Sequence, residues 1–199
     1  MKLSIRRTVL LMTLFAALLP PTSARGQAVT ATVAVGPGLA NALAVNPTTS
    51  KVYVAVGPGT CRTMTDGTVV VIDGPTNSTT TITAGLCPVA IAVNPATNKI
   101  YVANIGSTYG FGAYSGGSVT VIDGATNSTT TIDDPHAPDA IAVNPATNKI
   151  YVVNLNSTDV LVIDGETNAT STVADPNAIA PVAVALNPVT NKIYVANGG

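Results

Sequence analysis

Thirteen residues, AIAVNPATNKIYV, occur twice in this chain, at 90–102 and again at 140–152. Looser copies continue the pattern, with Asn-Pro pairs that begin at Asn46, Asn94, Asn144 and Asn187. The tripeptide VID recurs in step and ends at Asp73, Asp123 and Asp164, which sets a minimal unit of roughly 42 residues. Repeats of this length that contain only strand-like runs predict β-propeller blades, one four-stranded sheet per copy.

Each copy divides into four candidate strands, which we name A to D from the inside of the blade outwards. In the second copy the apolar run 89–93 is strand A, because a nearly continuous apolar strand is buried on both faces. Strand B is 99–104, strand C is 118–123, and the Thr-rich run 128–132 is the polar strand D. The turns NPATNK and DGATNS join A to B and C to D, where Pro and Asn favour tight geometry.

Charged residues recur at the same places in every copy. A Lys opens strand B and an Asp ends strand C, so antiparallel pairing should set them side by side, contributing about 0.2–1 kcal/mol per exposed pair. The pairs are Lys51 with Asp73, Lys99 with Asp123, and Lys149 with Asp164. We therefore interpret the lysines as structural rather than catalytic. The glycosylation pattern also appears at Asn77 and Asn127, with Asn168 similar, and turn chemistry explains the same letters.

The composition favours an all-β domain. The chain is 46% hydrophobic and 10% charged, which is too apolar for a disordered chain. Val, Ile and Thr suit a pleated surface, and no stretch has the polar periodicity of an amphipathic helix.

Residues 1–28 are predicted to be a secretory signal peptide. Lys2, Arg6 and Arg7 precede an apolar run, Thr8 to Leu19, that is too short to span a bilayer. The general secretory route and the twin-arginine route both remain open. Removing this leader leaves five Lys/Arg against ten Asp/Glu, a net charge of −5, which opposes nucleic acid as a partner. We expect a periplasmic, cell-surface or secreted protein with no transmembrane segment in the mature chain.

The repeated letters also resemble a known family. NKIYVAN followed by SVTVIDGATN is similar to the YVTN β-propeller repeat, a relative of WD40-like and quinoprotein-dehydrogenase-like propellers, over nearly all of 29–199. The signature is present as YVAN at 101–104, YVVN at 151–154 and YVAN at 194–197, with Ala or Val in place of the family's Thr. The resemblance implies a propeller fold and an exported protein. It implies no shared set of catalytic residues.

The strand count predicts about three and a half blades and an incomplete ring. We place the blades at 40–83, 89–132 and 139–174, with a partial blade at 182–199 and a lone outer strand at 29–35. The lone strand completes a small four-bladed ring in one interpretation. In the other, which we favour, the sequence is a piece of a longer propeller and forms an open arc.

The irregular segments of the sequence all fall on the face formed by the B–C and D–A loops. Loops on a regular scaffold often carry binding sites, so we place the candidate site there. In an exported chain Cys61 and Cys87 are expected to form a disulfide, with free thiols as the alternative. The glycine-rich loop 104–118 offers Tyr109, Phe111 and Tyr114, which either contact a partner or fold back onto the blade.

The next D–A loop, DDPHAPD, supplies the remaining candidates. Asp133, Asp134 and the only histidine, His136, could bind a divalent cation, but their spacing matches no established loop. Asp139 replaces an apolar residue near the channel mouth, where Val89 and Val182 are its equivalents.

These features favour a non-enzymatic module that binds protein or carbohydrate through its loop face. The sequence contains no nucleophile elbow, no zinc-protease motif and no glycine-rich phosphate loop, and we predict no cofactor. A propeller-type enzyme, either a lactonase-like hydrolase or a redox subunit, and a structural surface-layer module remain as alternatives.

Overall fold

The structure is a computed structural model that describes residues 31–62, 64–109, 113–174, 176 and 179–198. The predicted leader, 1–28, lies outside the described residues. The chain divides into two units, 1–32 and 33–199, and the account below concerns the second. No helix in the described part of the chain is long and apolar enough to cross a membrane.

The second unit is an all-β propeller arc, as the repeats predict. Its first blade contains β1 (Leu39–Asn46), β2 (Lys51–Gly57), β3 (Asp66–Asp73) and β4 (Thr79–Leu86). The second contains β5 (Pro88–Asn94), β6 (Lys99–Asn104), β9 (Ser118–Asp123) and β10 (Thr129–Asp133). The third contains β11 (Pro138–Asn144), β12 (Lys149–Asn154), β13 (Asp159–Asp164) and β14 (Thr170–Ala174). A two-stranded fourth blade pairs β15 (Pro181–Asn187) with β16 (Lys192–Asn197), and all pairings are antiparallel.

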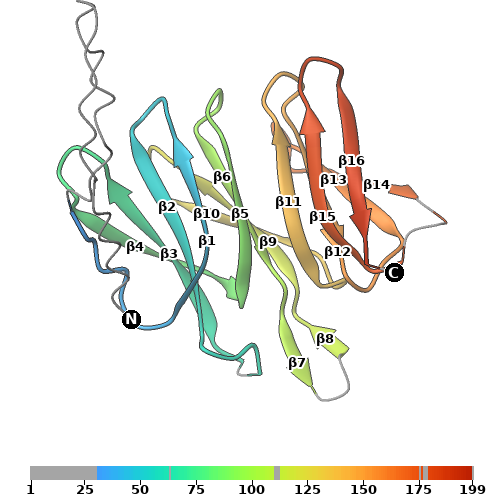
Figure 1. Cartoon of the computed structure of the whole chain (residues 1–199), viewed down its shortest axis with the longest axis horizontal. Coiled ribbons are helices and arrows are strands. Elements are labelled where there is room, and N and C mark those ends of the chain that lie inside the picture. The colour runs from blue at the N-terminus through green and yellow to red at the C-terminus, as the bar shows by residue number, and fades with distance from the viewer. Residues whose placement is uncertain (1–30, 63, 110–112, 175, 177–178, 199) are drawn as a thin grey trace, which may run out of the picture. The chain divides into compact units, whose positions relative to one another are not determined.

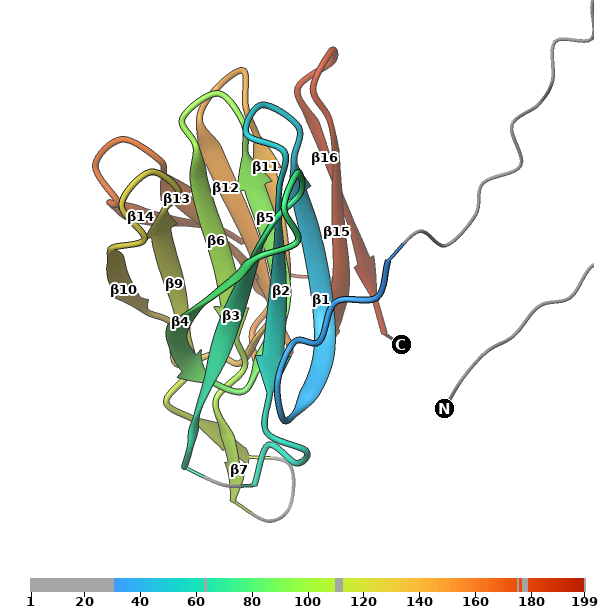
Figure 2. The ribbon, with the colours of Figure 1, turned by 90° about the vertical axis from the view of Figure 1, so that its left-hand side faces the viewer.

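The blades stand side by side around their innermost strands. β1 lies beside β5, β5 beside β11, and β11 beside β15, in the order of the chain (Figure 1). From this inner edge the sheets run outwards to the Thr-rich strands, so that β1 and β15 lie on one side and β10 and β14 on the other (Figure 2). The first and fourth blades form the two ends of the arc and leave large apolar side chains exposed, among them Leu43 of β1 at 66% and Tyr194 of β16 at 57%. The arc is therefore open.

The predicted outer strand at 29–35 is not formed over its described part, because residues 31–36 belong to no strand. Val35 instead packs against the buried side chains of Val54, Val56 and Val70 on the first blade. Two glycines and a proline at 36–38 follow the segment, and these residues favour turns over strands.

The core lies between blades rather than within one blade. We call the side of a blade that meets the next blade its trailing face, and the opposite side its leading face. Tyr53 and Val69 on the trailing face of the first blade cluster with Ile100 and Ile122 on the leading face of the second. Tyr101 and Val119 repeat the arrangement against the third blade. The apolar faces that meet at these two junctions are therefore buried between neighbouring blades, as expected for a repeat fold.

Two polar contacts repeat at the junctions between blades. The side-chain amide of each buried Asn-Pro asparagine donates to an asparagine of the next blade over 2.8 Å, and the three pairs are Asn46–Asn98, Asn94–Asn148 and Asn144–Asn191. Lysines cross the same junctions. Lys51 Nζ donates to the carbonyl of Gly124 over 3.2 Å, and Lys99 Nζ donates to the carbonyl of Gly165 over 2.5 Å.

The predicted Lys–Asp pairings are confirmed by the strand register, in which Lys51 lies opposite Asp73, Lys99 opposite Asp123 and Lys149 opposite Asp164. Only the third pair makes an ion pair among the described residues, with a distance of 2.6 Å between Lys149 Nζ and Asp164 Oδ2. Over the described residues the fourth blade consists of two strands and offers no C–D turn carbonyl to Lys149, which contacts its own blade instead. The hydrogen bond from Lys149 and those from the turn amides hold the pKa of Asp164 well below its usual range.

The repeated C–D turns have the backbone geometry and hydrogen bonds that their Asn and Asp residues favour. The asparagines at 77, 127 and 168 adopt positive φ of 58°, 62° and 61°, a conformation that asparagine tolerates better than most residues. The aspartate that opens each C–D turn accepts hydrogen bonds from turn amides, for example from Thr126 N to Asp123 Oδ1 over 2.9 Å. Turn geometry therefore accounts for the TN pairs without glycosylation.

Candidate functional site

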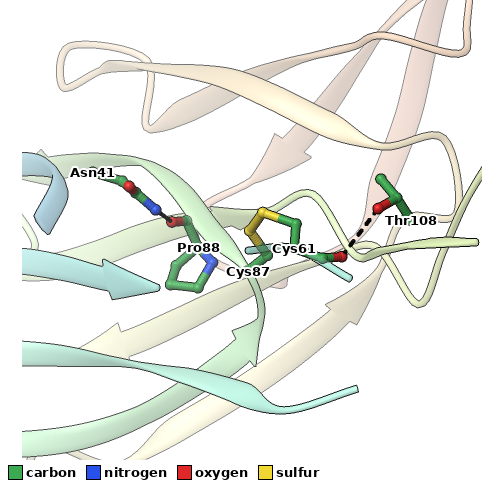
Figure 3. Close-up of a disulfide and its surroundings, with 5 residues drawn as sticks. All are labelled: Asn41, Cys61, Cys87, Pro88 and Thr108. Atoms are coloured by element: carbon green, nitrogen blue, oxygen red, sulfur yellow. Dashed lines mark hydrogen bonds between the residues drawn. A yellow bond between two sulfur atoms is a disulfide. The ribbon is translucent and has the colours of Figure 1, made fainter. Parts of the chain in front are cut away.

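The loop face is held together by a disulfide between Cys61, in the β2–β3 loop, and Cys87, between β4 and β5 (Figure 3). The two Cα atoms are 5.4 Å apart, and the predicted pairing is confirmed. Cys87 is buried in a small apolar cluster with Ile105 and Ala137, against which Tyr114 packs. Loops from three blades therefore pack against one another in this cluster.

A short hairpin extends from the second blade on the same face. It pairs β7 (Ser107–Tyr109) with β8 (Ala113–Ser115). Thr108 N donates to the carbonyl of Cys61 over 2.8 Å, and the Thr108 hydroxyl donates to the same oxygen over 3.4 Å (Figure 3), so the hairpin is attached to the disulfide loop. Tyr114 is half-buried on the cluster and covers the loops, whereas Phe111 and the side chain of Tyr109 lie outside the described residues. One of the three predicted aromatics therefore folds back onto the scaffold.

The DDPHAPD loop places its carboxylates in different surroundings. Asp134 is 2% exposed and accepts hydrogen bonds at Oδ1 from Asn154 Nδ2 and from the backbone N of His136, each over 3.3 Å. His136 Nδ1 lies 3.5 Å from the same oxygen, while its ring is largely exposed. Asp134 Oδ2 has no hydrogen-bond partner among the described residues. Asp134 therefore anchors the loop from inside and is closed to a large ligand.

Asp139 occupies a β-bulge in the innermost strand of the third blade. The register of β11 with β12 shifts between Pro138 and Ala140, which leaves Asp139 without a partner in the ladder. Asn41 has the same place in the first blade, and its amide donates to the carbonyl of Pro88 in the next blade over 2.8 Å (Figure 3). An ionised carboxylate at this position cannot make the hydrogen bond that Asn41 makes, because it has no proton to donate. Burial raises the pKa of Asp139 above its usual range.

Asp139→Asn should stabilise the protein at neutral pH and have little effect in acid. A raised pKa in the folded state means that stability falls as pH rises from the unfolded value, about 3.9, through the folded value. The carboxylate is still half-exposed, so the expected gain at pH 7 is below about 1 kcal/mol. Urea unfolding at pH 3 and pH 7 measures the difference, with the exposed Glu166→Gln as control. Equal gains at both pH values would contradict this account.

A polar groove lies between the first and second blades. It has a volume of about 380 Å³ and is lined by β3, β4, β9 and β10 and by the glycines before β9. Carboxylates flank it at Asp66 and Asp133, and hydroxyl groups line it at Thr83, Ser118, Thr120, Thr129 and Thr131. Asp133 is therefore the one predicted residue that belongs to this groove.

Asn104 organises two of the groove hydroxyls from beneath. Its buried side-chain amide donates to Ser118 Oγ over 3.2 Å and to Thr120 Oγ1 over 2.9 Å. Because each hydroxyl accepts from Asn104, its own hydrogen is free to donate elsewhere. The groove therefore combines oriented hydroxyl donors with carboxylate acceptors.

A second hollow of about 520 Å³ lies at the third blade, between the β12–β13 loop and residues 179–180. His136 and Leu155 are among its lining residues. It is wide, and none of its described lining residues is a carboxylate. Of the predicted site residues that the structure describes, only His136 lines it.

The predicted candidates thus fall into separate places rather than one site. Asp133 lines the groove, His136 lines the second hollow, Asp139 lies at the bulge of β11, and Tyr114 packs on the apolar cluster. No group of three or more His, Cys, Asp or Glu residues in the described ranges is arranged to hold a metal ion. Sequence reasoning missed Asp66 and the hydroxyls of β4 and β9, because strand threonines look the same whether or not a groove opens beside them.

No protein-family model matches the sequence, and a search of curated proteins finds no match. Solved structures do match. Hydrazine synthase from Kuenenia stuttgartiensis is 20% identical with a TM-score of 0.65, and the alignment covers 85% of this chain and 44% of that one. A functionally unknown protein from Desulfotomaculum acetoxidans is 14% identical with a TM-score of 0.62, covering 81% and 50%.

An auxiliary nutrient binding protein from Bacteroides ovatus is 14% identical with a TM-score of 0.58, covering 80% of this chain and 36% of that one. The chain thus spans half or less of the length of these three structures. At such low identity the likeness shows the fold alone, and the fold is that of a β-propeller.

Proposed function

We propose that this chain is an exported, non-enzymatic propeller module that binds a glycan in the groove between its first and second blades. The observation that carries the proposal is the chemistry of the groove. Sugar hydroxyls both donate and accept hydrogen bonds, and the groove offers both kinds of partner. Asp66 and Asp133 are acceptors, while Ser118 and Thr120 present donors oriented by Asn104.

Other features support the same compartment and class. A disulfide suits an oxidising compartment, and the predicted leader at 1–28 provides the route of export. We assign the repeats to the YVTN type from their letters. The fold is shared with a protein described as an auxiliary nutrient binding protein, and a glycan is one form of nutrient.

A glycan array followed by calorimetry on the strongest hit tests the proposal. Asp66→Asn and Asp133→Asn keep the size of each side chain but remove an ionised acceptor. Since hydrogen bonds to charged groups contribute about 1.5–3 kcal/mol, each change should weaken binding roughly tenfold or more. Asp159→Asn, outside the groove, is the matched control. An array without hits, or a hit whose affinity ignores both groove substitutions, would rule the proposal out.

A further inference from the structure

The groove between the first and second blades is negatively charged. Two carboxylates, those of Asp66 and Asp133, belong to its described lining residues, and none of these residues is Lys, Arg or His. The other polar lining residues are threonines and one serine, which are neutral. The formal charge of the groove at neutral pH is therefore −2. Such a charge favours a ligand that carries positive charge and opposes a ligand with carboxylate or sulfate groups.

The groove also lacks a surface on which a sugar ring could stack. None of its described lining residues is aromatic, and the largest apolar side chain among them is that of Leu86. Aromatic rings are the side chains that supply the most apolar contact area, so apolar contact can contribute little to affinity here. Most of the binding free energy has to come from hydrogen bonds. Those between ionised groups are roughly twice as strong as those between neutral groups.

Comparison with the next junction shows why this place is open. Ala84 and Gly85 of β4 border the groove, and the strand register makes Asp134 and Pro135 their equivalents in the following copy. The Asp134 side chain is buried and accepts a hydrogen bond from Asn154 of the third blade. At the second junction a carboxylate of the chain itself thus crosses between the blades. At the first junction Ala84 and Gly85 have no side chain that can do so.

The first junction instead presents hydroxyl groups to the groove. Asn104, the equivalent of Asn154, donates to Ser118 and Thr120 of its own blade. These two residues are 6% and 3% exposed, and no described residue accepts a hydrogen bond from either hydroxyl. Both hydroxyls can therefore donate to oxygen atoms of a ligand. A ligand that suits the groove combines hydroxyl groups, for Ser118 and Thr120, with a cation, for the two carboxylates.

We propose, on the basis of the glycan-binding function above, that the groove selects amino sugars whose amine is free and protonated. The ammonium groups of such a glycan donate to Asp66 and Asp133, and its hydroxyl groups accept from Ser118 and Thr120. Acetylation removes the positive charge of an amine and with it the charged contact. A uronic acid is repelled by the same two carboxylates. The groove thus distinguishes a free amine from its acetylated form.

Calorimetry with matched tetrasaccharides tests this selectivity. The probes are the glucosamine tetramer, its fully N-acetylated form and the glucose tetramer with the same linkage. At about pH 6 the amines are protonated, because the pKa of an amine beside electron-withdrawing groups is near the α-amino value of about 7.7–8.0. The glucosamine tetramer should bind about tenfold or more tightly than the other two, as expected for hydrogen bonds to charged groups. Its advantage should shrink between about 0.01 M and 1 M salt.

A variant that adds charge gives the sharpest result. Thr83 lines the groove, and its equivalent in the next blade is Asp133, so β4 should accommodate an aspartate at this position. Thr83→Asp should strengthen binding of the glucosamine tetramer about two- to fivefold relative to Thr83→Asn, which has the same size and no charge. The two variants should bind the neutral tetramers equally. Asp66→Asn and Asp133→Asn should each reduce the preference for the amine.

The outcomes separate the selectivity from glycan binding itself. If a neutral tetramer binds as tightly as the glucosamine tetramer, and Thr83→Asp behaves like Thr83→Asn, the groove binds glycans without selecting amines and only the selectivity is wrong. If no glycan binds, charged or neutral, the proposed function is wrong as well. Amine binding that is unchanged in both Asp66→Asn and Asp133→Asn would place the ligand outside the groove and overturn the proposal.

Discussion

Tyr101→Ala should lower the free energy of unfolding by about 3–5 kcal/mol, the range for truncating a large aromatic side chain in a well-packed core. Tyr101 is fully buried between the second and third blades, in the cluster that contains Val119 and Ile150. The strands on both sides belong to continuous ladders, so the site cannot collapse to fill the cavity. Urea unfolding followed by circular dichroism measures the loss.

The repeat supplies a matched control for this change. Tyr194→Ala alters the same residue in the same local sequence, but Tyr194 is 57% exposed, so the loss should stay below about 1 kcal/mol in dilute solution. Similar losses at Tyr101 and Tyr194 would mean that burial between blades is not what stabilises the fold.

Tyr101→Phe separates the ring from its hydroxyl. The Tyr101 hydroxyl is buried and has no hydrogen-bond partner among the described residues, so its removal should be neutral or slightly stabilising. Burial, with a smaller contribution from Asp164, raises the pKa of Tyr101 to about 12. Stability should therefore fall as pH rises from about 10 to 12, and Tyr101→Phe should reduce that fall. A large loss at neutral pH would show that the hydroxyl has a partner in solution.

The architecture follows from the sequence because every copy repeats the same physical requirement. An AIAV strand with small and large residues in alternation suits the inner edge of a blade. Tyr101 and its equivalents then have to be buried by the next copy. The register that pairs Lys99 with Asp123 was predictable for the same reason, since turn letters mark where each strand begins and ends.

What sequence reasoning misses depends on contacts between copies. The lysines were predicted to pair with aspartates of their own blade. Lys99, however, donates to the carbonyl of Gly165 in the next blade, and a backbone acceptor leaves no signal in the sequence. Asp139 was recognised as unusual by alignment with Val89 and Val182, but the β-bulge that all three positions share is visible only in the strand register. The groove beside Asp133 was missed for the same reason, because residues of both the first and the second blade line it.

Removing the disulfide should lower the free energy of unfolding by about 3 kcal/mol. The cross-link joins residues 26 positions apart, and the chain-entropy model gives a value of this size for a loop of that length. The attached β7–β8 hairpin should also loosen, because Thr108 N is bonded to the carbonyl of Cys61. Unfolding in urea, with and without reductant, measures the first effect, and limited proteolysis at the hairpin measures the second.

The other copies of the repeat show that alanine can replace Cys87 without adding backbone strain. Cys87 adopts a φ of 53°, a strained conformation for most residues, but the equivalent residues Ala137 and Ala180 adopt 60° and 44°. Alanine is thus already accommodated at this place in the fold. The double variant Cys61→Ala, Cys87→Ala should then match the reduced wild-type protein in stability and be insensitive to reductant. If reductant leaves the wild type unchanged, the loop face is held by the cluster of Ile105 and Ala137 rather than by the bond between the sulfurs.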